Sequence, residues 1–210
     1  PPTKPVPRKF LQAAEALSQA SMAAYRGITG RQRFKKIAEY DQLTGVSNRY
    51  HFNNQAQIAL EYCDKNAKPA ALILFDLDHF KQLNDSLGHS YGDELLRQLA
   101  KRLTPTVRET DILARPGGDE FILLVKLQTT EQQIAAANAE LIGNKLLEEI
   151  RQPFMLHKLQ YHVTASIGIA LFNGDERSAS TLLKFADSAM NQAKAAGRNR
   201  CVIHSTHTKG

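Results

Sequence analysis

The order of the predicted elements indicates an α+β fold for this 210-residue chain, with helices packed on a central mixed or antiparallel sheet. Strand-like and helical patterns follow one another approximately as βααββαββαβ, without the regular alternation that a doubly wound parallel sheet requires. A Pro-Gly-Gly-Asp turn at residues 116–119 separates two short apolar runs and predicts an antiparallel hairpin. The composition, 42% hydrophobic and 23% charged, is typical of a globular domain with a real core.

The first forty residues differ in pattern from the rest. Residues 1–9 are rich in proline and lysine, and we expect them to be extended or disordered. Residues 10–40 predict a helical stalk with a weak heptad repeat, softened at Gly27 and Gly30. Two interpretations stay open: a dimer contact or link to an upstream module, and a helix packed on its own domain. The predicted domains are therefore an N-terminal extension over 1–40, a catalytic domain over 41–205 and a tail over 206–210.

The elements of the first half of the predicted domain follow from local signals. Asn48 is suited to cap a helix that runs to about residue 65. The apolar run 70–77 has the length of a buried strand. A short helix is expected from His79, and Asp78 is interpreted more readily as its cap than as a metal ligand. Residues 93–103 predict an amphipathic helix.

The second half is predicted in the same way. Two strands at 111–115 and 120–127 form the first hairpin, and a long helix covers 130–151. Residues 154–156 and 161–172 are interpreted as a second hairpin. A helix over 178–196 ends at Gly197, and a strand over 200–204 follows. Phe80 and Phe121 are assigned to the core, where aromatic side chains usually pack.

Charge and cysteine content limit the partners and the compartment. A net charge of +6 favours anionic partners, but the basic residues are scattered and form no stripe interleaved with aromatics, so we expect no nucleic-acid binding. Cys63 and Cys201 are far apart, which argues against a zinc site or disulfide framework and fits a reducing compartment. No apolar run reaches membrane-spanning length and no signal peptide is visible. We expect a cytoplasmic domain, whose parent protein could still be membrane-attached.

Two acidic clusters carry the chemistry. Asp76 and Asp78 end the most apolar strand and share one of its faces. Asp119 and Glu120 follow two glycines that let the backbone approach a ligand closely. Carboxylates that converge from a strand end and a hairpin suit a magnesium ion, as in polymerase and nucleotide-cyclase sites.

With these clusters in view, the chain resembles the GGDEF family of diguanylate cyclases over about residues 41–204. The signature itself is residues 117–121 (GGDEF). The other motifs are residues 41–49 (DQLTGVSNR), 76–85 (DLDHFKQLND) with the pairs 88–89 and 92–93, 166–168 (SIG), 186–194 (ADSAMNQAK) and 197–199 (GRN). Several ordered motifs over that length make a chance match very improbable.

The resemblance implies a palm-like, nucleotide-cyclase or ferredoxin-like fold and a role for each matching residue. Mg²⁺ or Mn²⁺ would be held by Asp76, the Leu77 carbonyl, Asp119 and Glu120. Asn84 and Asp93 would bind the guanine edge. The phosphates would meet Lys81, Lys194, Arg198 and the backbone of Gly117 and Gly118, with Asp119, Glu120 and Lys81 as the catalytic residues. Lys194 and Arg198 are four apart and are expected on one helix face.

The same resemblance implies a reaction and its control. Two GTP molecules would be condensed into cyclic di-GMP with release of two pyrophosphates, by a homodimer whose two sites face each other. Arg108 and Asp111 form an RxxD pattern at the offset of the family's inhibitory product site; a surface salt bridge is the simpler interpretation. The signal is expected to come from an upstream sensor domain that is not in this sequence.

Two departures and two alternatives accompany this prediction. Pro116 and Asn191 stand where the family usually has an aromatic or large apolar residue and a tyrosine, but neither change removes a metal or phosphate ligand. The first alternative is a silent GGDEF domain that senses GTP or cyclic di-GMP. The second is a nucleic-acid-binding or polymerase-like protein.

Overall fold

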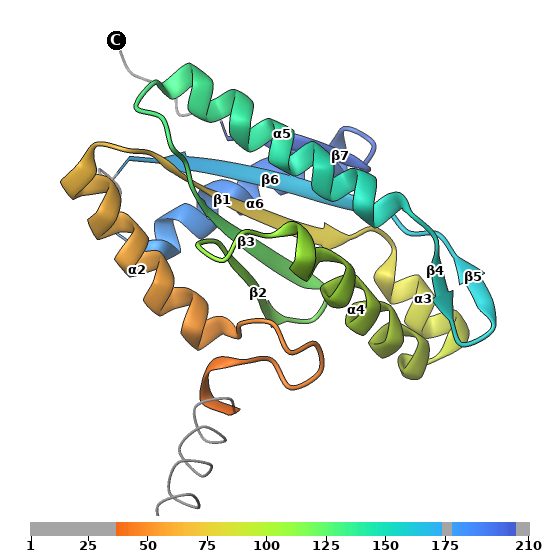
Figure 1. Ribbon diagram of the computed structural model, residues 1–210. Coiled ribbons are helices and arrows are strands. Elements are labelled where there is room, and N and C mark those ends of the chain that lie inside the picture. The colour runs from red at the N-terminus through yellow and green to blue at the C-terminus, as the bar shows by residue number, and fades with distance from the viewer. Residues whose placement is uncertain (1–36, 174–177, 205–210) are drawn as a thin grey trace, which may run out of the picture. The chain divides into compact units, whose positions relative to one another are not determined.

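The computed structural model describes residues 37–173 and 178–204, and the described residues from 39 onward form one compact unit. Nearly all of the predicted stalk and the whole predicted tail lie outside these ranges. Five strands form the main sheet in the order β2-β3-β1-β6-β7 (Figure 1). The strands are β1 (Ala70–Leu77), β2 (Ile112–Gly117), β3 (Glu120–Lys126), β6 (Ala165–Phe172) and β7 (Arg200–Ile203). Only the β6–β7 pair is parallel, so the predicted mainly antiparallel sheet is confirmed.

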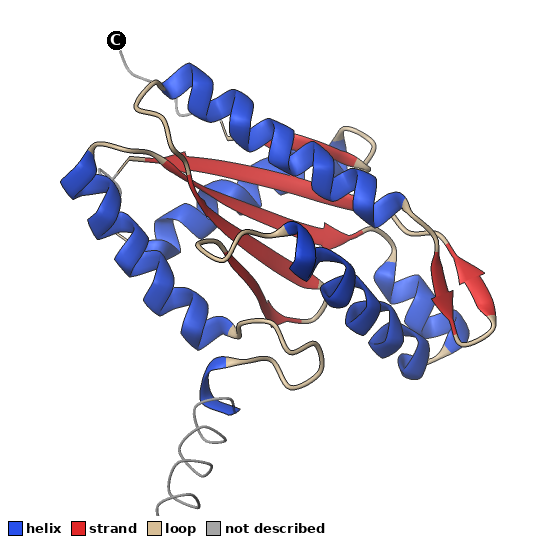
Figure 2. Ribbon diagram, in the orientation of Figure 1, coloured by secondary structure: helices blue, strands red, loops and turns tan. Residues whose placement is uncertain are grey.

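Helices cover both faces of this sheet, which gives the α+β layers visible in Figure 2. One face packs against α4 (His89–Leu103) and α5 (Gln132–Arg151). The other packs against α2 (Arg49–Asn66) and α6 (Ala179–Ala195). A short helix α3 (Phe80–Leu87), a 3₁₀ turn η1 (Thr104–Thr106) and a small hairpin of β4 (Phe154–Leu156) and β5 (Leu159–Tyr161) complete the described part. None of the described helices is long and apolar enough to cross a membrane.

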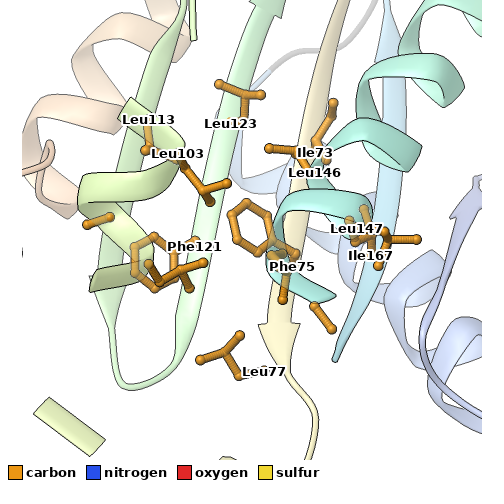
Figure 3. Close-up of a cluster of buried hydrophobic side chains, with 14 of the residues drawn as sticks. Ile73, Phe75, Leu77, Leu103, Leu113, Phe121, Leu123, Leu146, Leu147 and Ile167 are labelled. Carbon is orange, nitrogen blue, oxygen red and sulfur yellow. The ribbon is translucent and has the colours of Figure 1, made fainter. Parts of the chain in front are cut away.

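The core explains why the central strand is apolar on both faces. In β1, Phe75 is fully buried toward α4 and α5 and stacks on Phe121 of β3, with ring centroids 5.5 Å apart (Figure 3). Leu72 and Leu74 of the same strand face α2 and α6. Phe121 is core as predicted, and Phe80 is partly buried against the same cluster. Full burial of such side chains contributes about 1.5–3 kcal/mol each, which fixes the end of β1 in place.

Several element boundaries differ from the prediction. The helix expected from Asp93 begins at His89, directly after Gly88, whose φ of 91° ends the preceding helix. The second predicted hairpin is wrong: β4 pairs with the three-residue strand β5, while β6 enters the main sheet beside β1. The mostly exposed β5 has no alternating apolar pattern to reveal it. The cap at Asn48 is confirmed, because its side chain accepts a hydrogen bond from the His51 N–H.

Candidate active site

Strand pairing brings the two acidic clusters together. Asp76, near the end of β1, lies opposite Glu120, the first residue of β3. The turn before β3 contains Gly118 with a φ of 59°, a conformation that favours glycine. Carboxylates more than forty residues apart in sequence are thereby placed at one end of the sheet.

The carboxylates of Asp76 and Asp119 interact directly. Burial, and then the negative charge of Asp76, raise the pKa of Asp119 to about 6. Lys194 of α6 forms an ion pair with Asp76, with 2.5 Å between Nζ and Oδ2. The site is therefore an acid pair that is only partly neutralised, which suits a further cation.

A cleft of about 330 Å³ opens at this acid pair. It is lined by residues 76–82 together with Asp85, Asp119, Lys194 and Arg198. The structure thus brings seven predicted positions together on one cleft or beside it: Asp76, Leu77, Lys81, Gly118, Asp119, Lys194 and Arg198. Two acids, Asp76 and Asp119, and three cations line the same cleft, and such a surface can hold a metal-bound polyphosphate.

Glu120 is placed differently. It lies opposite Asp76 in the sheet, but its side chain lines a neighbouring cleft between α2 and α6. Within the described residues, no group of three or more His, Cys, Asp or Glu side chains has the spacing of a metal site. Asp76 and Asp119 are therefore the acids whose positions best fit the predicted metal, and Glu120 is adjacent to them.

The predicted guanine contacts lie on α3 and α4. Asn84 has a buried Oδ1 without a hydrogen-bond partner in the described part of the chain. Gly92 lies against this amide so closely that an added Cβ would collide with Oδ1. Asp93 follows Gly92, is half-exposed, and approaches Arg97 at 3.9 Å. A buried polar atom without a partner is unusual, since such groups are almost always satisfied, so the Asn84 oxygen is a candidate for a ligand contact.

Asp78 is not a helix cap, which corrects the prediction. The N-cap position of α3 is His79, with a φ of 62° and no side-chain cap. Asp78 is buried and accepts hydrogen bonds from Thr164 Oγ1 at 2.6 Å, Ser166 Oγ at 2.7 Å and the Asn199 N–H at 3.1 Å. Both carboxylate oxygens accept hydrogen bonds from protein groups, so these contacts give Asp78 a structural role at the end of β1.

The expected helix face of Lys194 and Arg198 is also wrong, although both side chains line the cleft. Helix α6 ends at Ala195, and Arg198 follows in a turn with a φ of 62°. The turn, and not helical spacing, places the guanidinium beside the cleft.

Sequence reasoning missed Arg115, which ties the hairpin that carries Asp119 to the turn after residue 40. Its Nε and Nη2 donate to the Gly118 carbonyl at 2.9 and 2.7 Å, and its Nη1 pairs with Asp41 at 2.9 Å. Asp41 also accepts from the Thr44 N–H and hydroxyl, and its pKa is lowered although burial opposes this. The sequence did contain a signal for this contact. Arg115 lies beside the Gly-Gly turn, and residues 41–44 form an Asp-x-x-Thr turn whose carboxylate could pair with it.

The predicted inhibitory pair lies in a separate cleft of about 290 Å³. Arg108 and Asp111 line it together with Tyr40 and residues 45–47. Burial raises the pKa of Asp111, although the nearby Arg108 opposes the shift. The two residues share one cleft away from the acid pair, as a second binding site requires.

Comparison with known proteins agrees with this geometry. A family model described as "Diguanylate cyclase, GGDEF domain" matches residues 38–200. The chain is 37% identical over 171 residues to the cyclic di-GMP phosphodiesterase NbdA of Pseudomonas aeruginosa, covering 81% of this chain and 21% of that protein. It is 37% identical over 164 residues to the bifunctional diguanylate cyclase/cyclic di-GMP phosphodiesterase MucR of the same organism, covering 78% and 23%.

A solved structure is also similar to this chain. The coiled coil and GGDEF domain of DgcB from Caulobacter crescentus, in complex with c-di-GMP, superposes with a TM-score of 0.76 at 26% identity, covering 92% of this chain and 98% of that one. The chain spans less than a quarter of the length of NbdA and MucR.

Proposed function

Because the chain belongs to the GGDEF family of diguanylate cyclase domains, we propose that it condenses two GTP molecules into cyclic di-GMP and two pyrophosphates. The observation that carries this proposal is the cleft in which Asp76 and Asp119 meet Lys194 and Arg198. A carboxyl group whose pKa is raised by burial and by a second acid, as that of Asp119 is, is typical of a functional site. The proposed catalytic domain covers residues 41–205.

The cleft suggests where the nucleotide binds. Lys81, Lys194 and Arg198 surround it with positive charge and would bind the triphosphate, with the Gly117–Gly118 backbone close by. Asn84 would use its unpartnered oxygen to accept from the guanine amide edge, and the Asp93 carboxylate could do the same. Gly92 supports this arrangement, because any side chain there would displace the Asn84 amide.

A divalent cation fits the acid pair. Asp76, the Leu77 carbonyl and Asp119 would supply hard oxygen ligands for Mg²⁺ or Mn²⁺, and Glu120, which lies opposite Asp76 in the sheet but lines the neighbouring cleft, would have to turn toward them to join. When bound, such a cation would neutralise phosphate charge and lower the pKa of the attacking hydroxyl. The raised pKa of Asp119 supports the assignment, since a cation would relieve the repulsion that raises it.

The reaction needs two such clefts. The 3′-hydroxyl oxygen of one GTP forms a bond to the α-phosphorus of the other in line, and the bond from that phosphorus to the β-phosphate bridging oxygen breaks. Pyrophosphate leaves with the electron pair, and the hydroxyl proton passes to a base. Asp119, with its pKa near 6, and Glu120 are the nearest candidates for that base. A second, symmetric step closes the ring, so we propose a two-fold homodimer with facing clefts.

We propose that Arg108 and Asp111 bind the product and inhibit the enzyme. A guanidinium can grip guanine or phosphate, and a carboxylate can accept from the guanine amide edge. Their common cleft supports this, and the DgcB structure was solved with c-di-GMP.

Replacing Arg108 with Ala should weaken inhibition by added cyclic di-GMP without lowering the initial rate. Inhibition of equal strength in the variant would count against the site.

A second candidate is a silent domain that binds GTP or cyclic di-GMP and regulates an attached partner. It is favoured by the relative NbdA, which is named a phosphodiesterase. The intact acids and the cations of the cleft argue for turnover instead.

The test is direct. The purified chain is freed of bound nucleotide and incubated at high concentration with GTP and Mg²⁺. The products are separated by chromatography and identified by mass spectrometry. Cyclic di-GMP with two pyrophosphates per molecule is expected. If an enforced dimer binds GTP but yields no cyclic di-GMP, the silent-domain alternative is correct.

A further inference from the structure

Three consecutive residues, Gly197, Arg198 and Asn199, have positive φ values of 105°, 62° and 51°. Glycine adopts this conformation freely and asparagine tolerates it, but for arginine it is disfavoured. Such backbone persists only where the surroundings hold it, and it gathers at functional sites. Arg198 is the member of this turn that lines the nucleotide cleft, so the contacts that hold the turn determine where its guanidinium lies.

Two side chains from other elements hold the turn at Asn199. From the end of β1, Asp78 accepts the Asn199 N–H at 3.1 Å. From the last residue of α5, Arg151 donates to the Asn199 side-chain oxygen at 2.8 Å and to its carbonyl at 3.1 Å. The backbone amide, the carbonyl and the side-chain oxygen of Asn199 are thus all bound.

The Asp78 anchor is itself fixed. Its carboxylate is buried and is held by the hydroxyls of Thr164 and Ser166, at 2.6 and 2.7 Å. Its own N–H donates to the Thr164 carbonyl at 2.8 Å. Because these partners lie just before and within β6, Asp78 couples the strand end that carries Asp76 to the turn that carries Arg198.

We propose that Arg151 and Asp78 are positioning residues for the triphosphate end of the nucleotide, because through Asn199 they hold the left-handed turn that presents Arg198 to the cleft. This inference rests on the proposed binding of GTP in that cleft, but not on turnover. Arg151 does not line the cleft and is exposed, so its effect must pass through Asn199. Asp78 acts from its hydrogen bonds and not as a metal ligand.

The test compares GTP with GMP, which share guanine and ribose but differ in the phosphates that Arg198 would meet. Binding of each to the whole chain is measured by calorimetry, in Mg²⁺, for the parent protein and for Arg151→Ala. We expect the GTP dissociation constant to rise roughly 5- to 20-fold, and that of GMP to change less than about twofold. The KM for GTP should rise with little change in kcat.

The matched control is Lys145→Ala, which removes an exposed cation of the same helix that is not hydrogen-bonded to Asn199 in the described part of the chain, and which should alter neither affinity. Arg151→Lys, which restores one donor, should recover part of the GTP affinity. Equal loss of GTP and GMP affinity in Arg151→Ala, or no loss of either, would overturn the proposal.

Asp78 is tested with an isosteric change. In Asp78→Asn, an amide oxygen in the place of Oδ2 still accepts from the Asn199 N–H and the Thr164 hydroxyl, and the Ser166 hydroxyl can rotate to accept from the amide nitrogen in the place of Oδ1. We expect the Mg²⁺ concentration for half-maximal GTP binding to stay within about twofold. A large increase would identify Asp78 as a metal ligand and contradict the positioning role.

The proposed function and this inference can fail separately. If the parent protein binds GTP better than GMP but makes no cyclic di-GMP, the proposed function fails, and the binding measurements on the variants still test the inference.

Discussion

At the scale of single residues, Asp119 combines an unfavourable environment with a predicted function. Burial and Asp76 raise its pKa to about 6, and the positive charge of Lys194, which pairs with Asp76 at 2.5 Å, opposes the shift only in part. Protons and Mg²⁺ should therefore compete for this carboxylate close to physiological pH. The competition gives a pH dependence whose direction can be stated in advance.

We predict that the apparent Mg²⁺ affinity and the cyclase rate fall as the pH is lowered through about 6, because protonated Asp119 cannot bind the cation. Higher Mg²⁺ should move the midpoint to lower pH, since the cation favours the carboxylate form. Initial rates from pH 5 to 8 at several Mg²⁺ concentrations measure this. A midpoint independent of Mg²⁺ would disprove the competition.

The same carboxylate should cost stability when no metal is bound. Its folded-state pKa of about 6 exceeds the ordinary value of 3.8, so the folded protein binds this proton more tightly than the unfolded chain. Ionisation of Asp119 therefore destabilises the folded protein. This effect is absent below about pH 4 and is complete only above about pH 6. Asp119→Asn should abolish turnover yet raise the metal-free melting temperature at pH 7.5 by about 2–4 °C, about 1 kcal/mol after allowing for partial exposure. This gain in melting temperature should vanish near pH 4. Melting temperatures measured by calorimetry at pH 4 and pH 7.5 check the prediction.

At the scale of elements, the hairpin between β2 and β3 is aimed by contacts from outside it. Arg115 bonds the Gly118 carbonyl twice and pairs with Asp41, and its side chain is only 11% exposed. A turn with two glycines would otherwise sample many conformations, and Asp119 with it. Because Arg115 is also paired with Asp41, its side chain is held in place and supports the turn that carries Asp119.

We predict that Arg115→Ala lowers kcat about 10- to 100-fold with a smaller change in the KM for GTP, because a small displacement of a catalytic carboxylate is costly. Asp41→Asn should lower it less, since both bonds to Gly118 remain. If the support works as a unit, the double variant should be no worse than Arg115→Ala alone. Additive losses would show that the two residues act separately.

Local sequence signals predicted most of the helices and strands, whereas contacts between residues far apart in the sequence were missed. Asn48 was identified as a cap because its partner, His51, is three residues away. Asp78 was misassigned because its three partners are 86 to 121 residues away, and nothing local reveals them. Arg198 was placed at the cleft by the motif but on the wrong backbone, since helical spacing cannot foresee a left-handed turn. Patterns thus locate an acid or a cation, while its orientation depends on tertiary contacts.

At the scale of the whole molecule, the proposed reaction joins two GTP molecules, and on this proposal each cleft would hold one of them. The specific activity should therefore increase with protein concentration and reach a plateau once dimers are saturated. Dilution series assayed at saturating GTP and Mg²⁺ measure this. A specific activity that stays constant down to nanomolar protein would indicate either a very tight dimer or a monomeric enzyme, and mixed dimers distinguish these.

The mixing experiment uses Asp119→Asn, which should fold well and pair normally but leave its own cleft inactive. At a total concentration on the plateau, the parent protein is replaced stepwise by the variant, with time for subunits to exchange. If both clefts of a dimer are needed to close the ring, the activity should follow the square of the parent fraction, so that an equal mixture keeps about a quarter. Replacement by Lys145→Ala should leave the activity unchanged. A linear fall to one half in the equal mixture would mean that each subunit works alone, and the two-fold arrangement of facing clefts would have to be abandoned.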